Sequence, residues 1–128
     1  MSEHGYGSVL ALALVFGGVL LVGLASDVAR SIVTWRETSH LAHTAAETGA
    51  GWVEPEALYR GELVVDVAAA EAAAAEIASG PGRTVSVDAN AEKVCVSVGQ
   101  SVSPRITRLV GGASKTVVVT ACAVPRRG

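Results

Sequence analysis

Apolar residues run without interruption from Ser8 to Ala25, and an amphipathic pattern then continues to Gly49. The apolar run has 18 residues with no charge and no proline, which is at the short end of the range for a membrane-spanning helix. In hydrocarbon a segment must satisfy its own backbone polar groups, so a lone run of this kind crosses as a helix. The alternative is a buried core helix, which a chain of only 128 residues can hardly cover on all sides.

Beyond Ala25 the pattern predicts that the same helix continues outside the membrane as a stalk. Apolar residues recur at helical spacing while charged residues fall mostly on the other side. At about 1.5 Å per residue the whole helix is roughly 60 Å long, about twice the hydrocarbon thickness. Gly49 and Gly51 mark its end. The apolar positions are Val28, Ile32, Trp35, Ala42 and Ala46, and the charged ones are Arg30, Arg36, Glu37 and Glu47.

Two further helices are predicted after Gly51. Pro55 is suited to the first position of a short helix that ends at Gly61, and Trp52 and Tyr59 around it are expected to pack over a small-residue core. Asp66 is an N-cap for an alanine-rich helix over residues 67–79, which the Gly-Pro-Gly of residues 80–82 stops. Its expected buried side comprises Val64, Val65, Ile77 and the alanine ridge, with Glu71 and Glu76 outward.

The remaining residues alternate with the period of β-strands. Three strands are predicted over residues 83–88, 92–98 and 114–124, the first two joined as a hairpin through residues 89–91. One or two helical turns are expected over residues 105–110, after Pro104. On one face of the hairpin, valines of both strands align: Val85 and Val87 with Val94, Val96 and Val98. The predicted class is α+β, with a pilin-like plan of one long helix followed by a small helix-on-sheet head.

Several of these stretches resemble one known family. Gly7 and Ser8 precede the apolar run, which ends in a D-V-A-R step at Asp27, Val28 and Arg30 and continues as an alanine-rich helix closing at Gly49-Ala50. This pattern is similar to the amino-terminal half of TadE/TadG-like proteins, the minor pseudopilins of Flp (Tad) pilus assembly. The carboxy-terminal stretch also resembles that family, because a short amphipathic link precedes a final valine/alanine strand. The resemblance covers most of the chain and implies a role in pilus assembly or secretion.

This interpretation divides the chain into three parts. Residues 1–25 form a short lead and the transmembrane helix, residues 26–51 the stalk, and residues 52–128 a small α+β head. The expected function is that of a non-enzymatic structural component in the bacterial envelope, single-pass, with the head outside the cytoplasm. Its expected partners are membrane lipid and other pilins, pseudopilins or assembly proteins. The alternative is a small secreted or envelope binding domain that signal peptidase releases.

Two processing positions follow from these alternatives. Gly7 is a possible leader cleavage position, although the fifth residue after it is Leu12, where type IV pilin leaders place a glutamate. Gly23 and Ala25 are small residues at the −3 and −1 positions of a possible signal-peptidase site. Arg30 and Arg36 follow the span and no Lys or Arg precedes it, so the positive-inside rule alone places the head in the cytoplasm. We instead expect it outside, because the cysteines and the resemblance both favour that side.

Composition narrows the possible ligands. The chain is 50% hydrophobic but only 4% aromatic, so its core must consist mainly of alanine and valine. A net charge of −2 gives no basic surface for nucleic acid. No catalytic frame, phosphate-binding loop or dinucleotide motif is present in the sequence, and we expect no catalytic residues, no cofactor and no small-molecule substrate. His40, His43 and Glu47 share a helix face, but without a fourth nearby ligand we expect no metal there.

Two pairs on the long helix are candidates for helix association. Ala13 and Gly17 form a small-xxx-small step that lets another helix approach closely. Asp27 and Arg30 lie one turn apart at the outer edge of the apolar run. They either mark a solvated membrane boundary or set the axial register of one helix against its neighbour.

The two cysteines are predicted to form a disulfide. If Cys95 lies opposite Cys122 in antiparallel strands, Ser97 faces Thr120 while Val96 and Val98 face Ala121 and Val119 on the other side. The register that joins the sulfurs therefore also aligns the apolar face, and a slip of one residue loses both. The alternative is a pair of buried free thiols.

Overall fold

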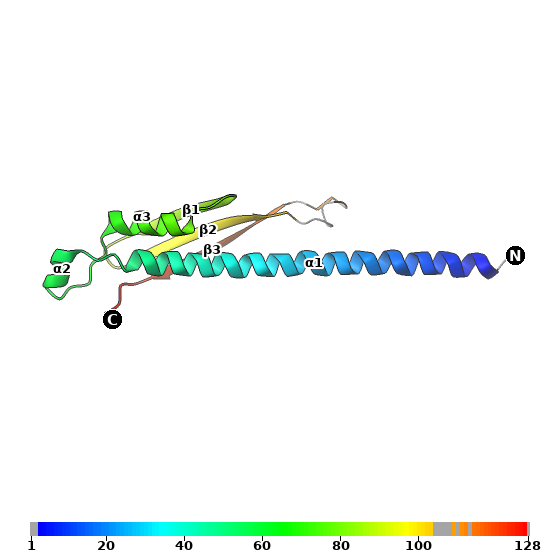
Figure 1. The fold of residues 1–128 in the computed structure, drawn as a ribbon, viewed down its shortest axis with the longest axis horizontal. Coiled ribbons are helices and arrows are strands. Elements are labelled where there is room, and N and C mark those ends of the chain that lie inside the picture. The colour runs from blue at the N-terminus through cyan, green and yellow to red at the C-terminus, as the bar shows by residue number, and fades with distance from the viewer. Residues whose placement is uncertain (1–2, 104–108, 110, 113, 128) are drawn as a thin grey trace. The chain divides into compact units, whose positions relative to one another are not determined.

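The computed structural model describes residues 3–103, 109, 111–112 and 114–127. Among them it contains helices α1, α2 and α3 followed by strands β1, β2 and β3, which form one antiparallel sheet (Figure 1). The predicted α+β, pilin-like layout is therefore confirmed. The elements are α1 Glu3–Ala50, α2 Pro55–Tyr59, α3 Val67–Ala78, β1 Arg83–Ala89, β2 Val94–Val102 and β3 Lys115–Ala123.

The chain divides into two compact units. One comprises Met1–Ile32 with Ser103–Ser114, and the other comprises Val33–Val102 with Lys115–Gly128. The second unit contains α2, α3, the sheet and the last part of α1, and we call it the head unit. The helical turns expected over residues 105–110 fall almost entirely outside the described residues.

α1 is a single helix that continues without a break through Ala25, as its uninterrupted pattern predicts. No proline interrupts it, and the glycines at positions 17, 18 and 23 are tolerated within it. At its end Gly51 donates its backbone N–H to the carbonyls of Glu47 (3.1 Å) and Thr48 (3.2 Å), which closes the last turn.

The two shorter helices begin at the predicted residues. Pro55 opens α2, which ends before Gly61 at a φ of 80°, a conformation that glycine adopts readily. The Asp66 carboxylate caps α3 by accepting the backbone N–H of Ala69 at 3.3 Å. α3 buries Ala70, Ala74 and Ala78, which recur every fourth residue and form one ridge.

The sheet has the predicted register. In β1 and β2, Val85 pairs with Val98 and Val87 with Val96, so the valines of the hairpin share one face. The hairpin loop comprises residues 90–93, one more than predicted, and Asn90 stabilises it. Its Oδ1 accepts the backbone N–H groups of Glu92 and Lys93, both at 2.9 Å.

The core of the head unit consists of small side chains from both helices and one face of the sheet. α3 and the end of α1 both lie against that face. Gly49 lets α1 approach closely, since a Cβ there would lie 3.0 Å from Cγ1 of Val94 and 3.2 Å from the carbonyl oxygen of Ala70. The buried core residues are Ala42, Ala45, Ala46, Ala50, Val65, Ala70, Ala74, Ala78, Val94, Val96, Val98 and Ala121.

Three side chains expected to be buried are exposed instead. Tyr59 is 93% exposed and Trp52 is 52% exposed, so the prediction that they pack over the core is wrong. Ile77 is 40% exposed, because only the Ala70–Ala74–Ala78 ridge of α3 meets the sheet. The helices and the sheet lie so close together that the core has room for alanine and valine. Larger side chains therefore remain on the surface.

On α1 within the head unit, burial begins at Thr38 rather than at Trp35. Thr38 is buried, and its hydroxyl donates to the carbonyl of Thr34 at 2.7 Å, which satisfies the polar group within the helix. Trp35 shares the helical stripe of Ala42 and Ala46 but is 53% exposed. The buried part of this stripe is thus confined to the last turns of α1.

Candidate functional site

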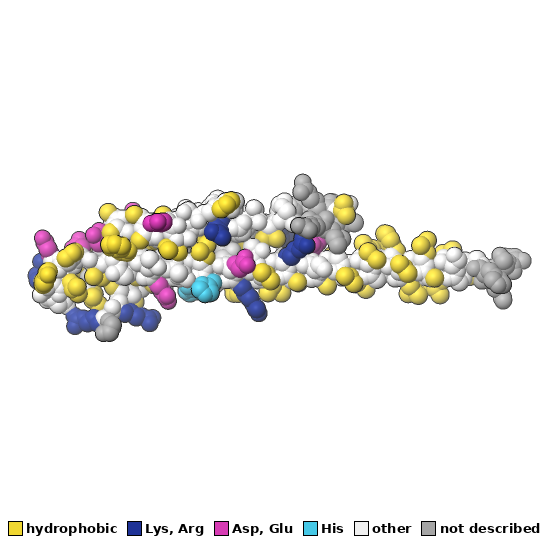
Figure 2. All heavy atoms as spheres, in the orientation of Figure 1, with side chains coloured by type: hydrophobic (Ala, Val, Ile, Leu, Met, Phe, Trp, Pro, Cys, Tyr) yellow, Lys and Arg dark blue, Asp and Glu magenta, His cyan; other side chains and the backbone are white. Residues whose placement is uncertain are grey.

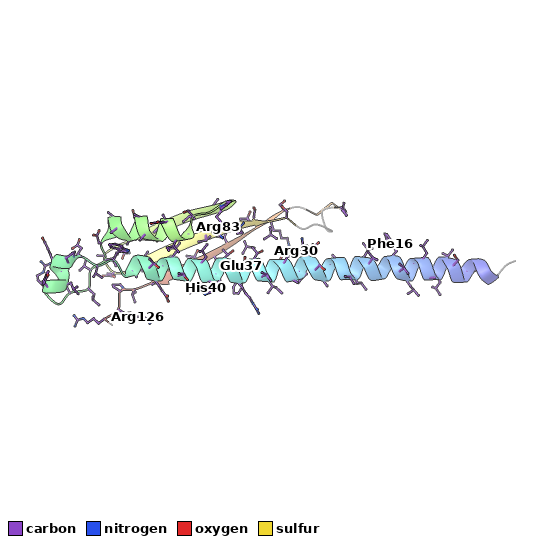
Figure 3. All side chains as sticks on the ribbon, in the orientation of Figure 1. Phe16, Arg30, Glu37, His40, Arg83 and Arg126 are labelled. Carbon is purple, nitrogen blue, oxygen red and sulfur yellow. A yellow bond between two sulfur atoms is a disulfide. The ribbon has the colours of Figure 1, made fainter. Side chains whose placement is uncertain are left out.

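The most extensive exposed apolar surface lies on the first half of α1. Its large side chains are exposed on all sides of the helix, and Figure 2 shows them as yellow spheres along it, with Phe16 labelled in Figure 3. The helix is long and apolar enough to cross a membrane. Water is a poor solvent for such a surface, so lipid or other helices must cover it. The residues are Val9, Leu10, Leu12, Leu14, Val15, Phe16, Val19, Leu21, Val22 and Leu24.

Ala13 and Gly17 lie on this surface with open space beside them. A Cβ added at Gly17 meets no atom within 4 Å, and the same holds for Gly18. A shallow depression of about 440 Å³ is lined by Gly18 and Gly23 together with neighbouring valines. The backbone is therefore open to a close helix contact at Gly17 and Gly18, whereas Gly23 is buried.

Asp27 and Arg30 differ in their surroundings. Asp27 is only 9% exposed, whereas Arg30 is exposed and forms no ion pair with any described residue. The carboxylate is therefore not a free surface group that a neighbouring helix can reach without rearrangement. The role of this pair in setting helix register remains a prediction.

The two possible processing positions both lie within α1. Gly7 and Ala25 are exposed, and the helix is continuous on either side of each. Neither residue therefore marks a boundary between elements.

Cys95 and Cys122 form a disulfide, as predicted. They are direct partners across β2 and β3, with Cα atoms 4.0 Å apart. Ser97 faces Thr120 beside them, and the two hydroxyls are hydrogen-bonded at 2.8 Å. The bond lies on the polar face of the sheet, opposite the face that carries the core, so it holds β2 and β3 in register from the solvent side.

His40, His43 and Glu47 line one shallow surface on α1 together with Trp35. His40, labelled in Figure 3, has its Nδ1 3.1 Å from the hydroxyl of Thr44. Among the described residues, no group of three or more His, Cys, Asp or Glu side chains is arranged to hold a metal ion. The surface therefore presents hydrogen-bonding groups next to an exposed indole.

The sequence placed Tyr6 in the lead and Phe16 in the membrane span, but it did not identify Trp35, Trp52 and Tyr59 as surface residues. The chain has five aromatic residues, and each is about half exposed or more. Aromatic side chains bury a large area when a partner covers them and are enriched in interaction surfaces. The available signal was the composition itself, because an alanine and valine core has no room for them. They are Tyr6, Phe16, Trp35, Trp52 and Tyr59.

No protein-family model, curated protein or solved structure matches this chain.

Proposed function

We propose that this protein is a membrane-anchored structural component of a Flp/Tad-type pilus assembly or secretion apparatus, similar to a minor pseudopilin. One observation supports this best: the helix that carries the exposed apolar surface also supplies, at its other end, part of the core of the head unit. A helix used as both anchor and core element is the pilin-like layout. The protein then acts by lateral association of α1 with the helices of other pilins or pseudopilins, and without enzymatic activity.

The helix association is tested by enlarging the small residues of α1. Gly17→Leu, in cells that assemble the apparatus, should reduce copurification of neighbouring subunits, because the leucine side chain keeps the helices apart. Val19→Leu, which enlarges an exposed residue on the opposite side of α1 from Gly17, is the matched control. Equal copurification of wild type and Gly17→Leu would argue against association through this face.

The Asp27 and Arg30 pair is tested separately. Because Asp27 is nearly buried in its own chain, Asp27→Ala is compared with Arg30→Ala, which changes an exposed charge at the same level of α1. If the pair sets the register between helices, both variants lose assembly while the head remains folded. Assembly and copurification like wild type in both would remove that idea.

We also propose that the head is outside the cytoplasm. The disulfide supports this placement, since structural disulfides persist in oxidising compartments and are rare in the cytosol. Protease added to intact spheroplasts should then digest the head. Full protection of the head, with digestion only after lysis, would reverse the orientation.

The second candidate function is that of a small envelope binding domain released by signal peptidase. It is favoured by one observation: every buried residue of the hydrophobic core lies after Ala25, so cleavage there removes none of them. Amino-terminal sequencing of the mature protein distinguishes the two. An intact start or one after Gly7 supports the anchored component, and a start at Ser26 supports the released domain.

A further inference from the structure

The head unit contains an open groove of about 910 Å³ beside the C-terminal tail. The end of α1 forms one wall with His43 and Glu47, and the tail forms another with residues 122–127. The floor is apolar, with Val53 and Leu63 half-buried and Leu58 about half exposed. A groove of this volume is large enough for several side chains of a partner.

The polar groups around this groove are mostly cationic. Lys93, Arg126 and Arg127 line it with exposed side chains, and Glu47 is the one carboxylate among the described residues that line it. The basic side chains beside the C-terminal tail are visible in Figure 2, and Arg126 is labelled in Figure 3. None of the three cations is within ion-pair distance of a described carboxylate. The groove thus combines an apolar floor with cations that have no ion-pair partner in the described part of the chain, and this combination suits an acidic segment with large apolar side chains.

The segment around α2 has the complementary chemistry. It carries Glu54, Glu56 and Glu62 together with the exposed Trp52 and Tyr59. Nη2 of Arg60 lies 3.8 Å from Oε2 of Glu62, so the guanidinium partly neutralises the Glu62 carboxylate. The carboxylates of Glu54 and Glu56 have no cationic partner among the described residues.

α2 borders the groove of its own chain through Leu58, and its attachments hold it in that position. The backbone N–H of Glu54 donates to the carbonyl of Val64 at 2.8 Å, and Val53 bridges Val65. Ala57 is fully buried on the inner side of α2, and Arg127 donates to the carbonyl of Gly61. These contacts hold the acidic segment on the surface, where it is available to another molecule.

We propose that the α2 segment of one copy of this chain docks in the basic groove of a second copy. Tyr59 and Trp52 then cover the apolar floor, and Glu54 and Glu56 face Lys93 and the tail arginines. Val53 and Leu58 belong to the segment and also line the groove, so the two surfaces adjoin. The segment of each copy can therefore lie in the groove of the other, which gives a closed two-fold dimer. The contact involves the head alone, so it is independent of the α1 association that we propose above.

Zero-length carbodiimide cross-linking of the full chain in detergent tests the contact directly. An equal mixture of ¹⁴N- and ¹⁵N-labelled protein should give a covalent dimer in which Lys93 of one isotope is joined to Glu54 or Glu56 of the other. Its yield should fall by about tenfold between 50 mM and 1 M salt, since salt screens exposed charges. If Lys93 of the wild-type protein forms intermolecular cross-links only to other carboxylates, the proposal is wrong.

A second experiment reverses the charges of the groove and of the segment. Lys93→Glu with Arg126→Glu and Arg127→Glu reverses the groove, and Glu54→Lys with Glu56→Lys reverses the segment. Each variant alone should lose dimer by about tenfold or more, because like charges then face each other. Mixing the two variants should restore dimer formation, because the acidic groove of one meets the basic segment of the other, and the groove and segment that were left unchanged also meet. Since these substitutions also change the cross-linkable residues, dimer is measured here by analytical ultracentrifugation.

The controls distinguish a loss of charge complementarity at the contact from a loss of folding. Glu71→Lys with Glu76→Lys reverses two exposed carboxylates of α3, and Arg83→Glu with Lys115→Glu reverses two exposed cations of the sheet. Both should dimerise like wild type, and an intact Cys95–Cys122 bond in every variant shows that the head is folded. A mixture that dimerises no better than the separate reversed variants would overturn the proposal. Failure of this contact with normal α1-dependent copurification would leave the proposed function intact.

Discussion

At the scale of single residues, the head unit depends on how closely its layers approach. Gly49 lies where α1 meets both α3 and β2, and a Cβ there would be 3.0 Å from a Val94 methyl group and 3.3 Å from the Ala74 methyl group. The neighbouring core positions are alanine and valine, so few of them can yield by changing a rotamer. The small size of these residues is therefore a requirement of the packing.

Gly49→Val should destabilise the head by about 2 kcal/mol, the typical cost of adding methyl groups to a filled core. Thermal unfolding of the full chain in detergent, followed by circular dichroism, measures the change. Ala72→Val introduces the same side chain at an exposed position of α3 and should change the midpoint little. An unchanged midpoint for Gly49→Val would mean that the layers separate easily and that close packing at Gly49 is not required.

The disulfide is the second residue-scale determinant. Cys95→Ala with Cys122→Ala opens a covalent loop between residues 27 apart in sequence, which should cost about 3.5 kcal/mol on chain-entropy grounds. For a head with so small a core, this is a large share of the total stability. Denaturant unfolding of wild type with and without reductant provides the comparison. The double variant should match reduced wild type and should not respond to reductant, and a variant as stable as oxidised wild type would contradict the prediction.

At the scale of elements, α3 combines high helix propensity with a defined start. Alanine is the best helix former, but a helix of 12 residues is marginal in isolation, so its position depends on the cap and on the buried ridge. The Asp66 carboxylate supplies the cap through its hydrogen bond with the backbone of Ala69.

Asp66→Ala should therefore lower the free energy of unfolding by about 1 kcal/mol. Asp66→Asn keeps a capping oxygen and is the matched control, with an expected loss of only a few tenths of a kcal/mol. Chemical denaturation with both variants measures the difference. Equal losses for the two would indicate that the negative charge, rather than the capping hydrogen bond, stabilises this end of α3.

At the scale of the whole molecule, the head does not begin where α1 ends. The sequence suggested a head over residues 52–128, but four alanines near the end of α1 are fully or almost fully buried in its core. The head unit accordingly begins within α1, at Val33. The long helix is thus a core element as well as the candidate membrane anchor.

Truncation at two positions tests this division. A chain that begins at Ser26 keeps all the buried core residues and should fold cooperatively and form the Cys95–Cys122 bond. A chain that begins at Gly51 lacks Ala42, Ala45, Ala46 and Ala50, so the valines of β2 lose part of their cover. It should show no cooperative unfolding transition by circular dichroism. A cooperative transition in the shorter chain would show that α1 is dispensable for the head.

The sequence by itself determined those features that depend on local pattern. The helical run without proline determined α1, the Asp66 cap and the alanines determined α3, and alternation determined the strands. The disulfide could also be predicted, because the register that joins Cys95 to Cys122 places the strand valines on one face, and a slip of one residue loses both.

Only the tertiary structure decided which surface of each element is covered and by what. The stripe through Trp35, Ala42 and Ala46 is apolar throughout, yet burial within the head unit begins at Thr38 because the sheet and α3 cover only the last turns of α1. Trp52 and Tyr59 were expected to pack over the core but are exposed. The groove brings together Lys93 and the C-terminal tail, which are far apart in sequence. Hydrophobic periodicity reports a preference for burial, whereas the distance between packed layers determines which side chains fit, and that distance depends on all the elements together.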